Sequence, residues 1–308
     1  MRVLNLVTTP EATFYQHQTR ALEAAGIETE TVAVGREPAA GESRSPLAYA
    51  RLVPTTLRRS LDDFDLVHAN NGLTAPAALL QQCLPVVVSL WGTDLMGKYG
   101  RFTRFFANRA DAVIVMTDEM AARLDREAHV IPHAVDLDTF RPIPSADART
   151  ELGWDHDSYQ VLFPYPKERR VKNYPRARRV VDAASERVDR PVELQTVFGV
   201  DHDRMPLYYG AADLLLLTSH REGSPNAVKE ALACDTPVVS VDVGDVDRRV
   251  ADAALSRVCQ SDPELVEGVV DVLTGADHEP GSERGAVTDL GTETMATRIR
   301  AVYDEVLD

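Results

Sequence analysis

Two glutamates with seven residues between them, Glu222 and Glu230, have the spacing in this chain that is best suited to chemistry. They follow the apolar run 212–219, which predicts a buried strand. Ser224 is a good helix N-cap and Pro225 suits the first helical position, so a helix is expected to begin at once. The free backbone N–H groups of a helix start favour a phosphate or another anion. We therefore expect both carboxylates, one in the loop and one on the second helical turn, to border one ligand.

The segment 163–173 supplies cations that suit such a ligand. Only four of the 33 basic residues are lysines, and two of them, Lys167 and Lys172, stand here, directly after the apolar run 161–163. An ammonium is a compact charge that neutralises phosphoryl oxygens, so cations at this strand end predict a diphosphate site. Arg169 and Arg170 are alternatives for the same role. A solvated basic loop is the simpler interpretation.

Short apolar runs separated by helical patterns must position these side chains. In the first half the predicted strands are 3–7, 31–34, 66–69, 86–90 and 112–116, and the predicted helices are 15–25 and 75–82. In the second half the predicted strands are 161–163, 192–197, 214–218 and 238–241, and the predicted helices are 175–185, 225–233, 263–273 and 294–307. Strands that alternate with helices predict the α/β class with parallel, doubly wound sheets.

Three prolines within 131–144 interrupt this alternation and predict a linker between two Rossmann-like domains. We expect an N-terminal domain over 1–135 and a C-terminal domain over 136–290, whose last part, 274–290, is a loop. A final amphipathic helix within 291–308 is expected to pack toward the N-terminal domain. Ligands of open parallel sheets bind beyond the carboxyl ends of the strands, so the expected site is a cleft between the domains.

Residues 213–244 resemble the C-terminal signature of the retaining GT-B glycosyltransferases of family 4 (glycosyl transferases group 1), including the spacing of the two glutamates. Residues 207–213 resemble the family's segment leading into that strand, and 132–136 resemble its interdomain Pro-Asn-Gly-Val-Asp. Segments 65–70 and 92–95 resemble cleft motifs of the N-terminal domain. The resemblance covers most of the chain. It implies a GT-B fold, in which two Rossmann-like domains face each other across a cleft.

The resemblance also implies a role for each residue of the site. Glu230 resembles the carboxylate that binds the ribose hydroxyls of the nucleotide, and Glu222 the one beside the transferred sugar. Lys167 and Lys172 match the basic pair that stabilises the leaving diphosphate. The resemblance implies that backbone N–H groups face the sugar and the diphosphate from the segment Gly223, Ser224, Pro225 and Asn226. Preplaced cations and amide dipoles lower the barrier without a metal, because charge grows on the departing phosphate as the sugar becomes oxocarbenium-like.

Four residues of the N-terminal half are candidates for the acceptor side. Trp91 stands where the family commonly has a histidine, and its ring suits the face of a sugar. Asp94 fits either a role toward the acceptor or a helix cap. His68 and His133 either line the cleft or are structural histidines at strand ends.

The net charge of −15 at pH 7 excludes a general nucleic-acid binder. An acid-rich, lysine-poor composition is typical of proteins that work at high salt, with an ordinary acidic cytosolic enzyme as the alternative. The cysteines at 83, 234 and 259 match neither a disulfide framework nor a metal spacing, so a reducing cytoplasm is expected. The N-terminal apolar run is too short for a signal peptide, and no apolar run is long enough to span a membrane. Peripheral contact with the inner face of the membrane stays open.

We therefore predict a glycosyltransferase that moves a sugar from a nucleotide-diphosphate sugar to a hydroxyl of a glycan, a lipid-linked or a small-molecule acceptor. We expect retention at the anomeric carbon and no metal or other cofactor. The Asp-x-Asp tripeptides at 136–138 and 245–247 are not expected to bind metal, because neither belongs to a metal-dependent fold pattern. Two other classes remain open: a nucleotide-sugar epimerase of the same fold, and a non-catalytic nucleotide-sugar-binding subunit.

Overall fold

The computed structural model describes residues 1–35, 44–275 and 281–308, which form two compact units. The first unit comprises 1–134 and 292–308, and the second comprises 135–291. Each unit is a parallel sheet covered by helices, so the predicted α/β class is confirmed. None of the helices in the described ranges combines the length and the apolar content needed to cross a membrane.

The first unit is built on a six-stranded sheet in the order β2-β1-β3-β4-β5-β6. Its strands are β1 (Arg2–Val7), β2 (Glu28–Ala33), β3 (Leu66–Ala69), β4 (Val86–Leu90), β5 (Ala112–Val115) and β6 (His129–Val130). The central strands are buried on both faces, which explains their mainly apolar sequences, with His68 in β3 and Ser89 in β4 as buried polar exceptions. β2 begins three residues before the predicted 31–34 because, as an edge strand, it carries partly exposed polar side chains.

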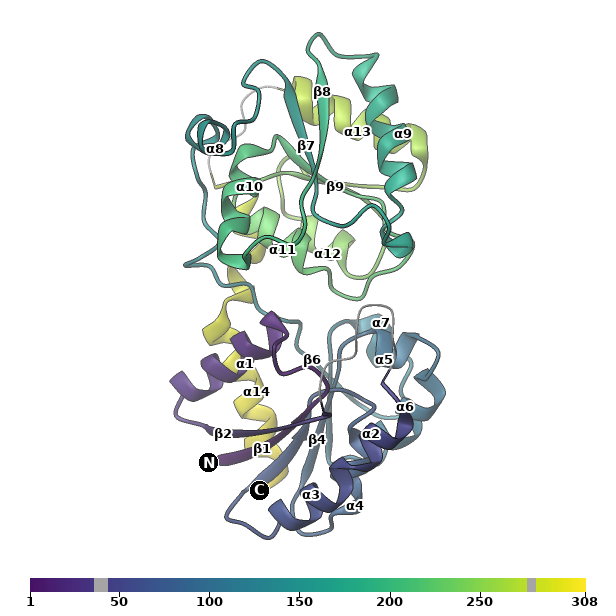
Figure 1. Ribbon diagram of the computed structural model, residues 1–308, viewed down its shortest axis with the longest axis vertical. Coiled ribbons are helices and arrows are strands. Elements are labelled where there is room, and N and C mark those ends of the chain that lie inside the picture. Colours follow the sequence, from purple (N-terminus) through teal and green to yellow (C-terminus); the bar gives the residue numbers. More distant parts are fainter. Residues whose placement is uncertain (36–43, 276–280) are drawn as a thin grey trace. The chain divides into compact units, whose positions relative to one another are not determined.

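The helices of the first unit are α1 (Thr13–Ala24), α2 (Pro46–Ala50), α3 (Leu52–Arg59), α4 (Ala75–Leu80), α5 (Thr93–Met96), α6 (Gly100–Ala107), α7 (Asp118–Ala121) and α14 (Thr292–Leu307). The last helix, α14, belongs to this unit and packs against α1. Figure 1 shows α1 and α14 on one side of the first sheet and α2, α3, α4 and α6 on the other.

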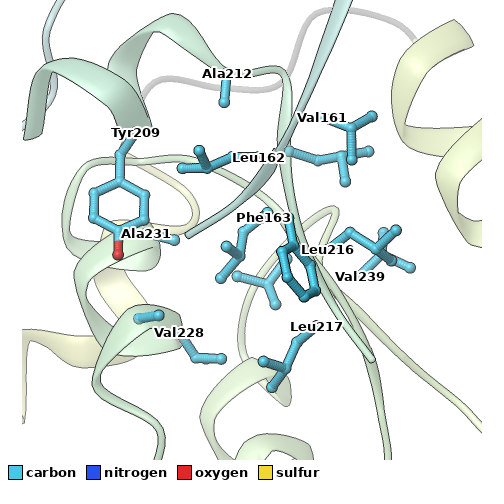
Figure 2. Close-up of a cluster of buried hydrophobic side chains, with 14 of the residues drawn as sticks. Val161, Leu162, Phe163, Tyr209, Ala212, Leu216, Leu217, Val228, Ala231 and Val239 are labelled. Atoms are coloured by element: carbon cyan, nitrogen blue, oxygen red, sulfur yellow. The ribbon is translucent and has the colours of Figure 1, made fainter. Parts of the chain in front are cut away.

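The second unit has a five-stranded sheet in the order β11-β10-β9-β7-β8. Its strands are β7 (Tyr159–Phe163), β8 (Val192–Thr196), β9 (Leu214–Leu217), β10 (Val238–Val241) and β11 (Arg257–Cys259). Its helices are α8 (Ser145–Leu152), α9 (Tyr174–Ser185), α10 (Met205–Ala211), α11 (Asn226–Ala233), α12 (Val246–Val250) and α13 (Asp262–Thr274). All four leucines of β9 are fully buried at the centre of this sheet. Figure 2 shows Phe163 and Leu216 in the core with Tyr209 of α10, whose hydroxyl reaches the core's edge.

One predicted loop contains regular structure. Residues 276–280 of the predicted loop 274–290 lie outside the described residues, but Arg284–Leu290 form a 3-10 helix. The helix forms because Val287 and Leu290 are buried in the core of the second unit. Arg284 also anchors it by donating to the carbonyl oxygens of Leu137 (2.7 Å) and Phe140 (2.6 Å). The sequence did not predict this helix, because a glycine- and acid-rich composition is typical of a loop.

Candidate functional site

Glu222 and Lys172 form a buried ion pair beyond the carboxyl ends of β9 and β7. Lys172 lies in the 3-10 turn Arg170–Lys172, and its Nζ is 2.5 Å from Glu222 Oε1. The side chains are only 6% and 14% exposed. Burial lowers the pKa of Lys172, and the charge of Glu222 opposes that shift. Its ammonium also lies 3.7 Å from the centre of the Tyr165 ring, so a carboxylate and an aromatic face fix the cation together.

Glu230, on the second turn of α11, has different partners. Tyr209 Oη donates to its Oε2 at 2.8 Å, and His202 Nε2 lies 3.5 Å from its Oε1. Burial raises the pKa of Glu230, while the charge of His202 and the hydrogen bond from Tyr209 act in the opposite direction. This side chain is therefore a held, partly desolvated acceptor that suits paired hydroxyl groups.

Tyr165 lies within electrostatic range of both carboxylates. It lies two residues after β7 and is buried. Burial raises the pKa of its hydroxyl well above the usual value, and the charges of Glu222 and Glu230 raise it further. The charges of both carboxylates therefore reach one phenol, and the prediction that they border one ligand stays a prediction. Sequence reasoning missed Tyr165, Tyr209 and His202, although an aromatic residue just after a buried strand end is a recognisable signal.

The turn before α11 differs from its prediction. The N-cap of α11 is Pro225 rather than Ser224, and the helix begins at Asn226. Ser224 is not the cap because its Oγ donates instead to Asp245 Oδ2 at 2.9 Å, an ionised and hence stronger acceptor. Pro225 has no N–H, so only Gly223, Ser224 and Asn226 present a backbone donor here. None of these three N–H groups donates to another described residue.

Asp245 ties this turn to the segment after β10. Its N–H donates to the Gly223 carbonyl at 3.1 Å, and its Oδ2 accepts from Arg249 Nε at 2.9 Å. Gly244 is required beside it, because its φ is +63° and a Cβ there would lie 2.0 Å from the Gly223 oxygen. Hydrogen bonds from Asp245, in the loop after β10, thus hold the loop that carries Glu222.

The predicted basic residues of 167–172 divide in the structure. Lys167 is exposed, with its Nζ 5.1 Å from the centre of the Tyr174 ring, and it forms no ion pair with a described residue. Arg170 is exposed on the same 3-10 turn as Lys172. The charge of Arg169 lowers the pKa of both Tyr165 and Lys172. The charge of Arg169 therefore acts on Tyr165 and on Lys172, the partner of Glu222.

In the first unit, Asp94 and His68 make structural contacts. Asp94, the second residue of α5, accepts backbone N–H groups from Trp91, Gly92 and Leu95 through Oδ1 and from Gly72 through Oδ2. It is not a helix cap, because the N-cap of α5 is Gly92 and no side chain caps this helix. His68 is fully buried between Tyr303 Oη (2.6 Å from Nδ1) and Ser89 Oγ (2.7 Å from Nε2). Burial lowers the pKa of His68 to about 3, so the ring is neutral.

Trp91 and His133 instead meet in an aromatic cluster with Phe14. The rings of Phe14 and His133 are stacked with their centroids 4.4 Å apart, and Trp91 meets Phe14 edge-on at 4.5 Å. Trp91 Nε1 is buried and has no acceptor among the described residues. Among the four candidates of the first unit, Trp91 and His133 belong to this aromatic cluster, whereas Asp94 and His68 are buried in structural contacts.

Comparisons with known proteins assign the family. Residues 12–139 match the description Glycosyltransferase Family 4, and residues 174–274 match Glycosyl transferases group 1. A D-inositol 3-phosphate glycosyltransferase of Xylanimonas cellulosilytica is 34% identical over 46% of this chain and 43% of its own length. D-inositol 3-phosphate glycosyltransferase 1 of Catenulispora acidiphila is 27% identical over 68% of this chain and 62% of its own length. The chain thus spans about half the length of these relatives.

Solved structures share the architecture over the whole chain. Sucrose-phosphate synthase from Thermosynechococcus elongatus has a TM-score of 0.80 at 17% identity, over 99% of both chains. Anabaena HepE in complex with UDP and glucose has a TM-score of 0.70 at 16% identity, over 99% of this chain and 100% of that chain. At these identities the likeness shows the fold alone, and it confirms the predicted GT-B fold. The chain belongs to the GT-B glycosyltransferases of family 4 (glycosyl transferases group 1).

Proposed function

We propose that this chain transfers a sugar from a nucleotide-diphosphate sugar to an acceptor hydroxyl, with retention at the anomeric carbon and without a metal. The observation that carries the proposal is a pair of differently held carboxylates, one paired with Lys172 and one with Tyr209, whose charges both act on Tyr165. Glu222 is bonded to an ammonium, and Glu230 is bonded to a phenol and lies near an imidazole. Such a pair suits a ligand with both an anionic centre and several hydroxyl groups.

Glu230 is proposed to bind the ribose. A carboxylate accepts about four hydrogen bonds, and Tyr209 occupies one position on Glu230 Oε2. The remaining positions suit the two adjacent hydroxyls of a ribose. Hydrogen bonds to a charged group contribute about 1.5–3 kcal/mol each, enough to dominate nucleotide affinity.

The leaving diphosphate is proposed to lie near Lys172, Arg169 and the turn before α11. The held ammonium and the three backbone N–H groups of the turn are in place before charge develops, as electrostatic stabilisation of a transition state requires. Glu222 Oε2, which accepts no hydrogen bond from a described residue, is available to a sugar hydroxyl. This arrangement supplies the positive charge from the protein's own groups, which supports a metal-independent reaction.

The compared proteins suggest where a substrate search should begin. HepE was solved with UDP and with UDP-glucose, and the sequence relatives are named D-inositol 3-phosphate glycosyltransferases. We therefore propose a uridine-diphosphate sugar as the first donor to test and a phosphorylated polyol as the first acceptor. Glycan and lipid-linked acceptors follow.

The composition supports a reducing cytoplasm at high salt as the setting. The chain has 48 acidic and 33 basic residues, and its three cysteines are free thiols. At about 1 M salt the screening length falls to about 3 Å, which weakens repulsion among the acidic side chains. Assays should therefore include a salt series.

The direct test measures UDP binding and sugar transfer separately. In Glu230→Gln the Tyr209 hydrogen bond can persist while the charge is lost, so we expect UDP affinity to fall roughly 10- to 150-fold. In Glu222→Gln we expect transfer to fall at least about a hundredfold with UDP affinity nearly unchanged. Glu186→Gln, an exposed glutamate after α9, is the matched control. NMR of the anomeric proton tests retention, and EDTA tests metal independence.

Three results would refute the proposal. Binding of nucleotide-sugars without turnover in the presence of any acceptor identifies a binding subunit. Isomerisation of the free nucleotide-sugar identifies an epimerase. Equal UDP affinity in wild type and Glu230→Gln shows that this carboxylate does not hold the nucleotide.

A further inference from the structure

The first unit has a positive region in an otherwise strongly acidic chain. Residues 44–110 contain eight basic and four acidic residues, whereas the whole chain has a net charge of −15. One of the four acids, Asp94, is buried, and the others, at 62, 63 and 65, stand together in the turn before β3. The stretches 44–61 and 95–110 each carry four basic residues and no acid.

Exposed apolar side chains gather in the same region. Of the ten large apolar residues that are exposed among the described residues, seven lie within 44–110: Leu47, Leu57, Leu61, Leu80, Tyr99, Phe102 and Phe105. They belong to α2, α3, α4 and α6 or directly adjoin them. Helix α2 packs on α3, α3 on α4, and α4 on α6, all on the side of the sheet opposite α1 and α14 (Figure 1). We call this surface the basic apolar face.

Cations and aromatic rings alternate along α6. Tyr99, Phe102 and Phe105 are 49%, 47% and 52% exposed, and the guanidinium carbon of Arg109 lies 3.6 Å from the centre of the Phe105 ring. Lys98 Nζ lies 5.5 Å from the centre of the Tyr99 ring. The rings of Phe102 and Phe105 pack on Phe106, yet about half of the surface of Tyr99, Phe102 and Phe105 stays exposed to water. Rings flanked by long cationic side chains are the composition that interfacial segments use at a lipid surface.

Most of the cations on this face are available. Five of them, Arg51, Arg58, Lys98, Arg101 and Arg109, form no ion pair with a described residue. Arg104 is within 3.8 Å of Asp125, and Arg59 pairs with Glu30 and Asp62. Unpaired surface cations attract an anionic partner over about 10 Å at about 0.1 M salt and over only about 3 Å at about 1 M salt.

We propose that the basic apolar face docks this protein on an anionic lipid surface, with the rings of α6 entering the headgroup region and the surrounding arginines contacting lipid phosphates. The proposal goes beyond sugar transfer and does not depend on the identity of donor or acceptor. A second copy of the chain, meeting this face through a two-fold axis, would set the unpaired cations against each other. A nucleic acid would leave the seven apolar side chains unpartnered. A bilayer satisfies both the charge and the apolar surface.

The test is flotation with vesicles of phosphatidylglycerol or of phosphatidylcholine, at about 0.1 M and about 1 M salt. We expect binding to phosphatidylglycerol that weakens at the higher salt, and at least tenfold weaker partition on phosphatidylcholine. Lys98→Gln with Arg101→Gln should weaken partition about 25-fold, at about fivefold for each basic side chain. Phe102→Ser with Phe105→Ser should lower it at least tenfold.

Matched controls lie in the second unit. Phe198→Ser removes an aromatic ring that is 54% exposed, and Arg187→Gln removes an exposed cation. Neither should change partition, and UDP affinity should be the same in all variants. Hydrogen exchange of the wild-type chain needs no substitution: phosphatidylglycerol vesicles should protect amides within 98–109 and leave those of β8 unchanged.

The opposite results are equally clear. Equal binding to both lipids, equal losses in the controls, or no flotation of folded protein at low salt would overturn the proposal. A dimer in sedimentation that Phe102→Ser with Phe105→Ser dissociates, together with no vesicle binding, would assign the face to a second copy. If sugar transfer fails but these lipid results hold, only the proposed catalytic function is affected.

Discussion

A buried ammonium on α11 should make the stability of the second unit depend on pH in the alkaline range. Lys229 is 1% exposed, and burial lowers its pKa from 10.5 to about 8. The charge of Asp245 opposes this shift, and that of Arg249 adds to it. Lys229 therefore lies near Asp245 and Arg249, the charged residues next to the loop that carries Glu222.

The size and sign of the effect follow from these values. A drop from 10.5 to about 8 corresponds to roughly 3 kcal/mol of free energy. The unfolded lysine keeps its proton up to about pH 10.5, whereas the folded one releases it near pH 8. The unfolded state thus binds more protons between these values, so the free energy of unfolding should rise with pH across this window. In Lys229→Met that rise should disappear.

The chain's composition makes both the pKa and the stability measurable. With only four lysines, selective labelling of lysine side-chain carbon should give four NMR resonances, and the one lost in Lys229→Met should titrate near pH 8. The chain has two tryptophans, so in a Trp91→Phe background the fluorescence of Trp154 reports on unfolding of the second unit. Urea unfolding from pH 7.5 to 10.5 should then show the slope for Lys229, with Lys98→Met, an exposed lysine, as the control.

Comparison of variant with parent cancels the contributions of other titrating groups. The reasoning is wrong if the resonance of Lys229 titrates near 10.5. It is also wrong if the unfolding free energies of parent and Lys229→Met run parallel across the window, while the Lys98→Met control behaves as expected. Either result would show that the partners of Lys229 compensate fully for its burial.

Two further substitutions test buried polar contacts, one in each unit. Asp245→Ala should lower the free energy of unfolding by about 3 kcal/mol, because Arg249 keeps a buried charge without its carboxylate; Asp182→Ala, which breaks an exposed pair, should change it by under about 1 kcal/mol in the same urea titration. Tyr303→Phe should lower it by about 2 kcal/mol, because a buried nitrogen of His68 loses its partner; a loss below about 0.5 kcal/mol would show that the hydroxyl does not hold α14 in place.

Burial decided which strands could be read from the sequence. β9 and β4 are buried throughout, so β9 appears as an unbroken apolar run and β4 as a run interrupted only by Ser89, and each was predicted to within a residue. The edge strands β6 and β11 have two and three residues and only partial burial, and no pattern distinguished them. The predicted helices also omitted α2, α5, α7 and α12, because four or five residues do not establish a helical period. They omitted α3, α6, α8 and α10 as well, whose seven or eight residues span only about two turns.

The site was predictable in its residues and less so in their pairing. Spacing along one helix placed Glu230, and the scarcity of lysine drew attention to Lys172. That Glu222 is the partner of Lys172 follows only from the neighbouring positions of β7 and β9 in the sheet, which bring together residues 50 apart in sequence. Tyr209 approaches Glu230 for a similar reason, because α10 packs against α11.

The wrong prediction of the α11 helix cap shows that a charged residue distant in sequence can override a local capping preference. A serine before a proline is a sound N-cap signal, yet Ser224 turns to Asp245, 21 residues away, because an ionised carboxylate binds a hydroxyl more strongly than a neutral cap geometry does. The same carboxylate accepts from Arg249, and the backbone N–H of Asp245 donates to the Gly223 carbonyl. The position of Glu222 relative to Lys172 thus depends on Asp245 and Arg249 as well as on the sequence of the loop itself. A substitution at Asp245 should therefore alter catalysis although the residue lies outside the set implied by the family resemblance.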